Sequence, residues 1–149
     1  MSTLDQNMGN PIGSEKVPNS RTSGHLEVRG RITEVAKSLI PNVTIYTIDC
    51  GDVKIKFDVQ SKLVRLKSGD EVVITISKHL PNYEKGVDFV AWGYVMSLKQ
   101  GESLFKMVIS LWGYIVIVET NKQELLSGFN FMDKVYFKIS RPTNTSVST

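Results

Sequence analysis

The side chains of this chain that could do chemistry are few and scattered. His25 and His79 are its only histidines, and each falls beside a predicted loop. A hydrolase or transferase needs a nucleophile with a base, paired carboxylates or grouped metal ligands. Asp49 and Asp52 flank a predicted hairpin turn, where aspartates usually cap the turn, and two carboxylates alone make a poor cation site. The sequence therefore predicts solvent-exposed loop histidines and no catalytic residue, metal site or cofactor.

Other signatures of enzymes and membrane proteins are missing from the sequence. It contains no glycine-rich phosphate loop, dinucleotide fingerprint or zinc-ligand spacing. The single cysteine, Cys50, can form neither an internal disulfide nor a multi-thiolate metal site, which favours a reducing compartment. No apolar run approaches the roughly 20 residues that a membrane-spanning helix needs. We therefore predict a cytoplasmic protein that is not an enzyme on its own and does not contact a membrane.

A group of basic residues is the second candidate for chemistry. The formal net charge of +3 permits nucleic-acid binding without requiring it. Small barrels of the oligonucleotide-binding type combine such charge with exposed aromatic side chains on which bases stack. Acidic residues interleave with these cations, so a solvated barrel face is the other interpretation. The candidate nucleic-acid-facing residues are Arg29, Arg31, Lys54, Lys56, Lys62, Arg65 and Lys67.

Two strand-like segments each carry Trp-Gly-Tyr, at residues 92–94 and 112–114. Glycine weakens a strand interior, so its place beside a large aromatic indicates a bend, a bulge or a close backbone approach. In the first segment, alternate residues from 90 to 98 form a face that is too apolar for open solvent, which makes it core or interface. The candidate interface or barrel-corner residues are Phe89, Trp92, Gly93, Tyr94, Trp112, Gly113, Tyr114 and Tyr136. Trp112 is expected to be buried.

The elements that must position these residues are strands. Apolar and polar residues alternate from residue 26 onward, and the clearest case has Val53, Ile55 and Phe57 on one face with lysines on the other. Further strands are predicted at 43–50, 71–77, 88–98, 103–111, 114–120 and 134–140, with one short helical turn at 123–126. Such a set indicates an all-β antiparallel barrel or sandwich, and we favour the eight-stranded barrel because closure removes exposed edges.

The ends of the chain differ in composition from this strand-rich region. Residues 1–24 and 142–149 are polar and contain few bulky apolar side chains. Such segments bury too little apolar surface to offset the entropy of ordering. The predicted organisation is therefore a disordered N-terminal tail at 1–24, one β-barrel domain at 25–141 and a disordered C-terminal tail at 142–149.

Several of these motifs resemble a known family. The segments DFVAWGYV at 88–95, ISLWGYIV at 109–116, ELLSGF at 124–129 and VYFKI at 135–139 follow one another as in the small β-barrel subunit of archaeal and eukaryotic RNA polymerases, called subunit eight or the G subunit. The segments at 54–59 and 69–76 resemble its first half. Tyr114 departs from the Gly-Gly that the family's hairpin often has. The short loop at 79–87 favours an archaeal member, because eukaryotic members have a long loop there.

This resemblance implies a fold and a role. The fold is an eight-stranded barrel related to the oligonucleotide-binding (OB) fold, docked on the largest polymerase subunit and in contact with DNA or RNA only indirectly. The resemblance implies no catalytic residue in this chain, because the family's metal-binding aspartates belong to the largest subunit. It therefore predicts a non-catalytic assembly subunit that supports DNA-templated transcription. The alternative from another class is a free-standing OB-type protein that binds single-stranded nucleic acid.

Overall fold

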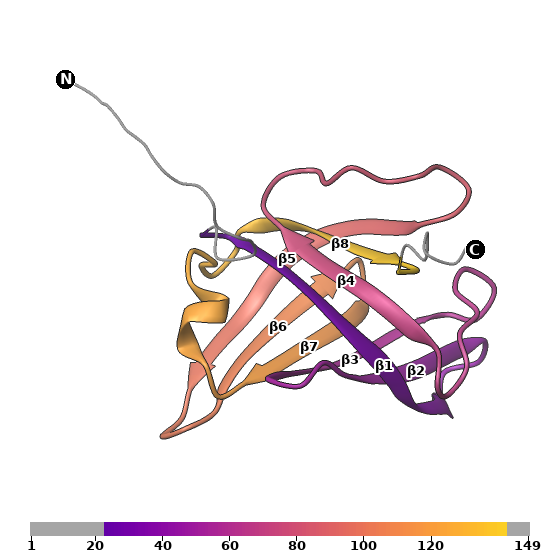
Figure 1. Cartoon of the computed structure of the whole chain (residues 1–149), viewed down its shortest axis with the longest axis horizontal. Coiled ribbons are helices and arrows are strands. Elements are labelled where there is room, and N and C mark those ends of the chain that lie inside the picture. The colour runs from indigo at the N-terminus through magenta and orange to yellow at the C-terminus, as the bar shows by residue number, and fades with distance from the viewer. Residues whose placement is uncertain (1–22, 143–149) are drawn as a thin grey trace, which may run out of the picture.

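The computed structural model describes residues 23–142, in which eight antiparallel strands close into a barrel (Figure 1). The strands are β1 (His25–Lys37), β2 (Val43–Asp49), β3 (Val53–Gln60), β4 (Glu71–Ser77), β5 (Phe89–Gln100), β6 (Phe105–Leu111), β7 (Tyr114–Thr120) and β8 (Lys134–Ser140). A 3₁₀ turn, η2 (Gln123–Leu126), is the one helical element in the described part of the chain. The all-β barrel predicted from the sequence is confirmed.

The ends of the barrel domain lie close to the limits of what the structure describes. The predicted tails fall outside the described residues, except for Ser23, Gly24 and Pro142. The Gly24 backbone N–H donates to the carbonyl of Ser127, 2.9 Å away, so the start of β1 is held beside the segment that follows η2. Between residues 23 and 142 there is no helix long and apolar enough to cross a membrane.

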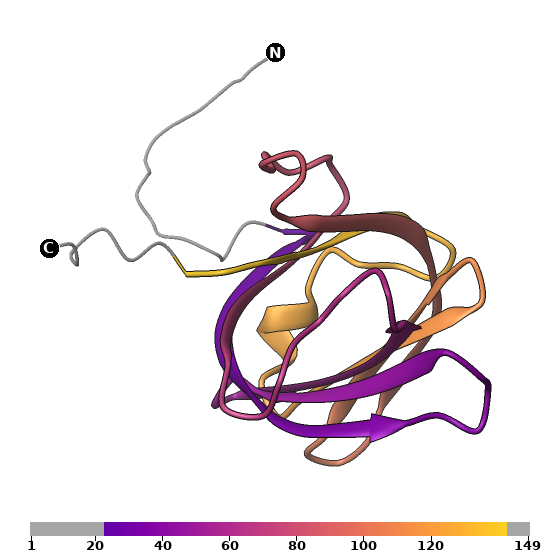
Figure 2. The same ribbon diagram turned by 90° about the vertical axis from the view of Figure 1, so that its right-hand side faces the viewer.

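The strands follow one another around the barrel in the order β1-β2-β3-β7-β6-β5-β8-β4, and β4 pairs with β1 to complete the ring. Figure 2 looks into this ring from one end, and η2 is visible within its outline. Because each strand is hydrogen-bonded along both edges, the barrel leaves no free edge for another strand to join. Any partner must therefore recognise side chains on the outer faces or at the barrel ends.

Alternating side chains fill the interior. On β3 the buried residues are Val53, Ile55, Phe57 and Val59, as the sequence predicted. The Phe57 ring lies 5.3 Å, centroid to centroid, from both Tyr46 of β2 and Phe137 of β8. The contact between Phe57 and Phe137 crosses the ring from β3 to β8, so the interior is a packed core rather than a channel.

A bulge in β5 corrects one prediction. The pairing of β5 with β6 shifts between Val95 and Ser97, so the inward and outward sides exchange at Met96. Leu98 was expected to share a face with Trp92, but it pairs with Met107 and lines a pocket at the barrel end instead. The face formed by alternate residues therefore ends at Met96. Simple alternation cannot reveal a bulge, since the extra residue has no signature of its own.

Gly93 is required by a close approach of backbones. A Cβ atom at this position would collide with the backbone carbonyl of Ser110 on β6. The space left there is far smaller than any real carbon–oxygen contact needs, so only glycine fits. The glycine allows β5 and β6 to approach closely just before the β5 bulge, as the Trp-Gly-Tyr motif indicated.

We predict that Gly93→Ala lowers the free energy of unfolding by about 3 kcal/mol or more, because the added methyl group meets fixed backbone rather than a movable side chain. Urea denaturation of the purified chain measures this change. Gly101→Ala is the matched control, because a Cβ there has the carbonyl oxygen of Leu104 as its nearest neighbour, at 3.2 Å. Equal stability of Gly93→Ala and Gly101→Ala would contradict the close approach.

Candidate functional site

An aromatic cluster lies on the outside of the barrel, on β5, β8 and the turn between β6 and β7. We call it the outer aromatic surface, and its members are Trp92, Tyr94, Trp112, Lys134 and Tyr136. Strand register brings them together, because Trp92 pairs with Tyr136 and Tyr94 pairs with Lys134 across β5 and β8. Residues paired in this way present neighbouring side chains on one face.

The rings of this surface are in contact. Trp92 meets Trp112 edge to face, with centroids 4.7 Å apart and planes at 87°, and meets Tyr94 at 5.9 Å. The ammonium of Lys134 lies 4.4 Å from the Trp92 centroid and 5.4 Å from that of Tyr136. These are the favoured geometries of aromatic pairs and of cation–π contacts. The side chains of this surface therefore contact one another in the isolated chain.

Trp112 is exposed, although the sequence predicted that it would be buried. Together with Gly113 it forms a two-residue turn between β6 and β7, and both residues have positive φ, 58° and 103°. This is the pattern of a type I′ hairpin turn, which projects its residues away from the sheet. The Trp112 side chain is 68% exposed as a result. Gly113 is thus a turn residue, not a strand-interior one.

The outer aromatic surface continues as an aliphatic band over the next strands. Val108 of β6 pairs with Ile117 of β7, and Ser110 pairs with Ile115, all of them half-buried on the outer face. Met96, at the β5 bulge, is 49% exposed. Apolar side chains on the outer faces of four strands, β8, β5, β6 and β7, are unusual for the outside of a small barrel.

The remaining candidates from the Trp-Gly-Tyr segments serve the fold. Phe89 and Tyr114 pack against the core, while Gly93 and Gly113 shape the backbone. Lys134 was missed by sequence reasoning, because its place opposite Tyr94 follows from a pairing register that the sequence does not state.

The seven basic candidates do not gather into one cationic groove. Glu71 accepts from Arg29 at 3.1 Å and from Arg31 at 2.8 Å. Asp49 lies between Arg31 and Lys54 in the cross-strand register. The other four, Lys56 of β3 and Lys62, Arg65 and Lys67 of the segment after it, are exposed. None of the seven lies on the strands that carry the outer aromatic surface, whereas a groove for single strands needs cations and stacking rings together.

The residues with chemical potential have structural roles. Asp49 Oδ1 accepts from the Gly51 N–H at 3.0 Å, and Asp52 pairs with Lys122 at 2.9 Å, so both aspartates serve the turn region. Burial and, to a lesser degree, the charge of Asp49 raise the pKa of the Cys50 thiol to about 12, which keeps it protonated and unreactive. Within residues 23–142 no three His, Cys, Asp or Glu side chains come together to hold a metal ion.

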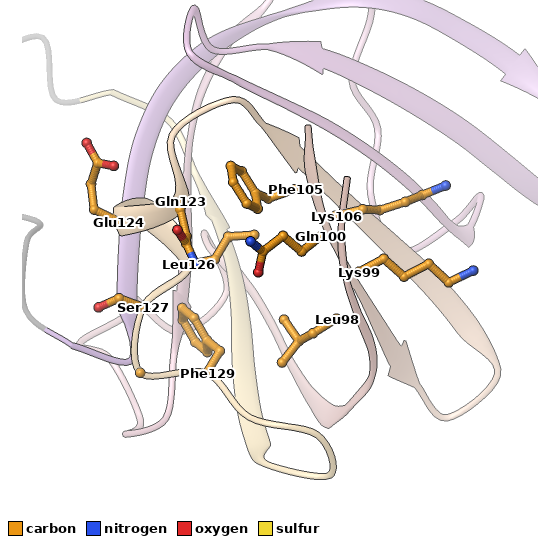
Figure 3. A pocket seen from close by; sticks show the side chains of 11 residues that line it. Leu98, Lys99, Gln100, Phe105, Lys106, Gln123, Glu124, Leu126, Ser127 and Phe129 are labelled. Atoms are coloured by element: carbon orange, nitrogen blue, oxygen red, sulfur yellow. The ribbon is translucent and has the colours of Figure 1, made fainter. Parts of the chain in front are cut away.

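A pocket of about 510 Å³ lies at the barrel end beside η2 (Figure 3). Figure 3 shows Leu98, Leu126 and Phe129 around it, with Lys99 and Lys106 extending away. Its single carboxylate is Glu124, and its lining contains no histidine or cysteine. This lining offers neither a nucleophile with a base nor paired carboxylates, so it does not support catalysis.

Comparison with known proteins places this barrel in a family. Residues 25–142 match the family of the G subunit of DNA-directed RNA polymerase, and this match covers nearly all of the described chain. The chain belongs to that family. The resemblance found in the sequence is therefore confirmed.

A curated relative agrees with this assignment. The DNA-directed RNA polymerase subunit Rpo8 of Sulfolobus acidocaldarius is 32% identical over 115 residues, which cover 74% of this chain and 93% of that protein. This relative supports the predicted archaeal kinship. A structure of the cytoplasmic molybdate-binding protein ModG with molybdate bound shares 16% identity over 79% of this chain and 91% of its own, with a TM-score of 0.32. A TM-score this low carries no argument.

In this polymerase-family barrel, we predict that Trp112→Asn changes the free energy of unfolding by no more than about 1 kcal/mol. Relief of a non-glycine residue at positive φ gains about 1–2 kcal/mol, and the lost contact with Trp92 costs about 0.5–1.5 kcal/mol. Urea denaturation distinguishes this result from the loss of about 3–5 kcal/mol expected when a buried tryptophan is truncated. A loss of that size would show that Trp112 supports the core.

Proposed function

We propose that this chain is a non-catalytic assembly subunit of DNA-directed RNA polymerase and docks on the largest subunit through the outer aromatic surface. Membership of the polymerase family supports a place in that enzyme. The observation that carries the docking face is the outward-facing aromatic cluster, in which Tyr94 and Trp112 are exposed and Trp92 and Tyr136 are half-buried. Its aliphatic continuation lies over β6 and β7. Tryptophan and tyrosine are enriched at the energetic centres of protein interfaces.

The preformed geometry of this surface favours docking over a purely structural role. Its rings already contact one another, so little side-chain entropy is lost when a partner covers them. A barrel without free strand edges is recognised through its side chains, and this surface supplies large ones. The flanking Lys134 ammonium provides a charged rim, which is the usual arrangement around an apolar interface centre.

In this account, nucleotidyl transfer is an activity of the polymerase complex and not of this chain. The Cys50 thiol is protonated. At the turn between β2 and β3, Asp49 accepts from the Gly51 N–H and Asp52 pairs with Lys122. The seven basic candidates from the sequence lie on other strands than the outer aromatic surface, which argues against the free single-stranded nucleic-acid binder. In this account the chain reaches DNA and RNA only through the assembled enzyme, in the cytoplasm where that enzyme works.

A double variant, Trp92→Ser with Trp112→Asn, tests the docking face. Each tryptophan of an interface centre contributes about 2–4 kcal/mol, so we expect affinity for the isolated largest subunit to fall at least 100-fold while the barrel stays folded. Binding is measured by surface plasmon resonance, and folding by circular dichroism and thermal denaturation.

Leu39→Asn is the matched control. Leu39 lies in the connection between β1 and β2, and its side chain is fully exposed. It is an apolar side chain outside the proposed docking face, so a docked partner should not cover it. Wild-type affinity in the folded double variant, or an equal loss in Leu39→Asn, would reject the outer aromatic surface as the docking face.

A further inference from the structure

A polar groove lies on a different part of the outer face, over β1, β4 and β8. It has a volume of about 550 Å³, and its roof is formed by His79, Leu80, Pro81 and Asn82 from the connection between β4 and β5, which rises from this side of the barrel (Figure 1). His25, which begins β1 and is half-buried, lines the same groove. The only two histidines of the chain therefore line one groove. His79 is an exposed loop residue, as the sequence predicted, whereas His25 is not.

Thr75 is the unusual residue of this groove. It is 1% exposed although its neighbours in register, Glu27 on β1 and Lys138 on β8, place it on the outer face of the barrel. Its Oγ1 atom is buried and has no hydrogen-bond partner within residues 23–142. Buried hydroxyls are almost always hydrogen-bonded, so an unpaired one that lines a groove indicates a missing partner.

The side chains around Thr75 supply a donor set. Lys138 Nζ donates to the carbonyl of Asn82 at 2.7 Å, which ties the roof to β8 and leaves two of its N–H groups for other acceptors. Ser77 Oγ accepts from the backbone N–H of His79 at 3.1 Å, which fixes where the roof begins. These two bonds fix the position of the roof beside Thr75.

One acidic side chain in this groove, Glu27, would repel a bound anion. Glu27 Oε1 lies 3.8 Å from His25 Nε2, and Glu27 is the only carboxylate among the lining residues. The lining therefore balances one lysine and two imidazoles against one carboxylate. Removal of the Glu27 charge should strengthen the binding of an anion, whereas it should weaken the binding of a cation.

We propose that this groove binds a phosphate group, with Thr75 Oγ1 and Lys138 Nζ as its donors and the imidazoles of His25 and His79 at its rim. A phosphate has enough oxygens to accept from all of these groups at once, and lysine is a common phosphate ligand. The volume exceeds that of a single phosphate and falls within the usual range of small-molecule sites. The groove therefore accommodates either free phosphate or the phosphate of a nucleotide.

The test is a titration of the full chain, followed by NMR signals of the Thr75 and Lys138 amides and of the two imidazole rings. One arm uses inorganic phosphate and the other a nucleoside monophosphate, so tighter binding in the second arm identifies a nucleotide as the source. Thr75→Val should weaken binding about tenfold, the usual effect of one lost hydrogen bond. Lys138→Gln should weaken it tenfold or more, and Glu27→Gln should tighten it several-fold.

Thr75→Val should leave the fold intact, because valine keeps the β-branched shape and removes a hydroxyl that has no partner in the described chain. Thr47→Val on β2 and Lys54→Gln on β3 are matched controls and should bind as the wild type does. Saturable binding in either arm that weakens in Thr75→Val and Lys138→Gln supports the site. No saturable shift in either arm, or wild-type affinity in both variants, overturns it and leaves a bound water as the partner of Thr75.

Discussion

Closure of the barrel is the constraint on which the rest of the structure depends. Each of the eight strands is hydrogen-bonded on both edges, so every second side chain points into a filled core and the others point outward. The interior takes Phe57, Phe137 and Tyr46. The large aromatic side chains of β5 and β8 that alternate with the core residues then have no place but the outer surface. An apolar outer face is thus a consequence of strand register rather than of any local signal.

Two local features adapt this barrel to its exposed face. Gly93 lets the backbones of β5 and β6 approach more closely than any side chain would allow, between the strand positions of Trp92 and Tyr94. Trp112 occupies a turn position that normally belongs to asparagine or glycine, at a cost in backbone strain. A tryptophan kept at such a position contributes little to the core, which agrees with a role in contact with a partner.

Much of the fold could be predicted from the sequence because its signals are local. The alternation in β3 and the Gly51-Asp52 turn before it specify a strand, a hairpin and an inner face without reference to the rest of the chain. The family resemblance was equally accessible, since it rests on the order of short motifs. The alternation in β5 predicted that one of its faces is core or interface, and the choice between the two depends on which side of the ring the core occupies.

Features that depend on distant parts of the chain could not be predicted in this way. Trp112 was expected to be buried, whereas the geometry of the β6–β7 turn projects it outward. The groove beside Thr75 joins β1, β4, β8 and the β4–β5 connection, so neither the place of His25 and His79 in one groove nor the burial of Thr75 has a sequence signature. The position of Leu98 at the barrel end was equally unpredictable, because it depends on the β5 bulge and therefore on the register between paired strands.

The measurement that tests the docking account most directly is hydroxyl-radical footprinting of the chain, free and within the assembled polymerase, read by mass spectrometry. The account predicts that Trp112, Tyr94 and Met96, all exposed in the isolated barrel, lose most of their reactivity in the complex. Leu39 and Leu63, exposed elsewhere on the barrel, should keep theirs. Unchanged reactivity of Trp112 on assembly, together with protection at Leu39 or Leu63, would contradict the outer aromatic surface as the docking face.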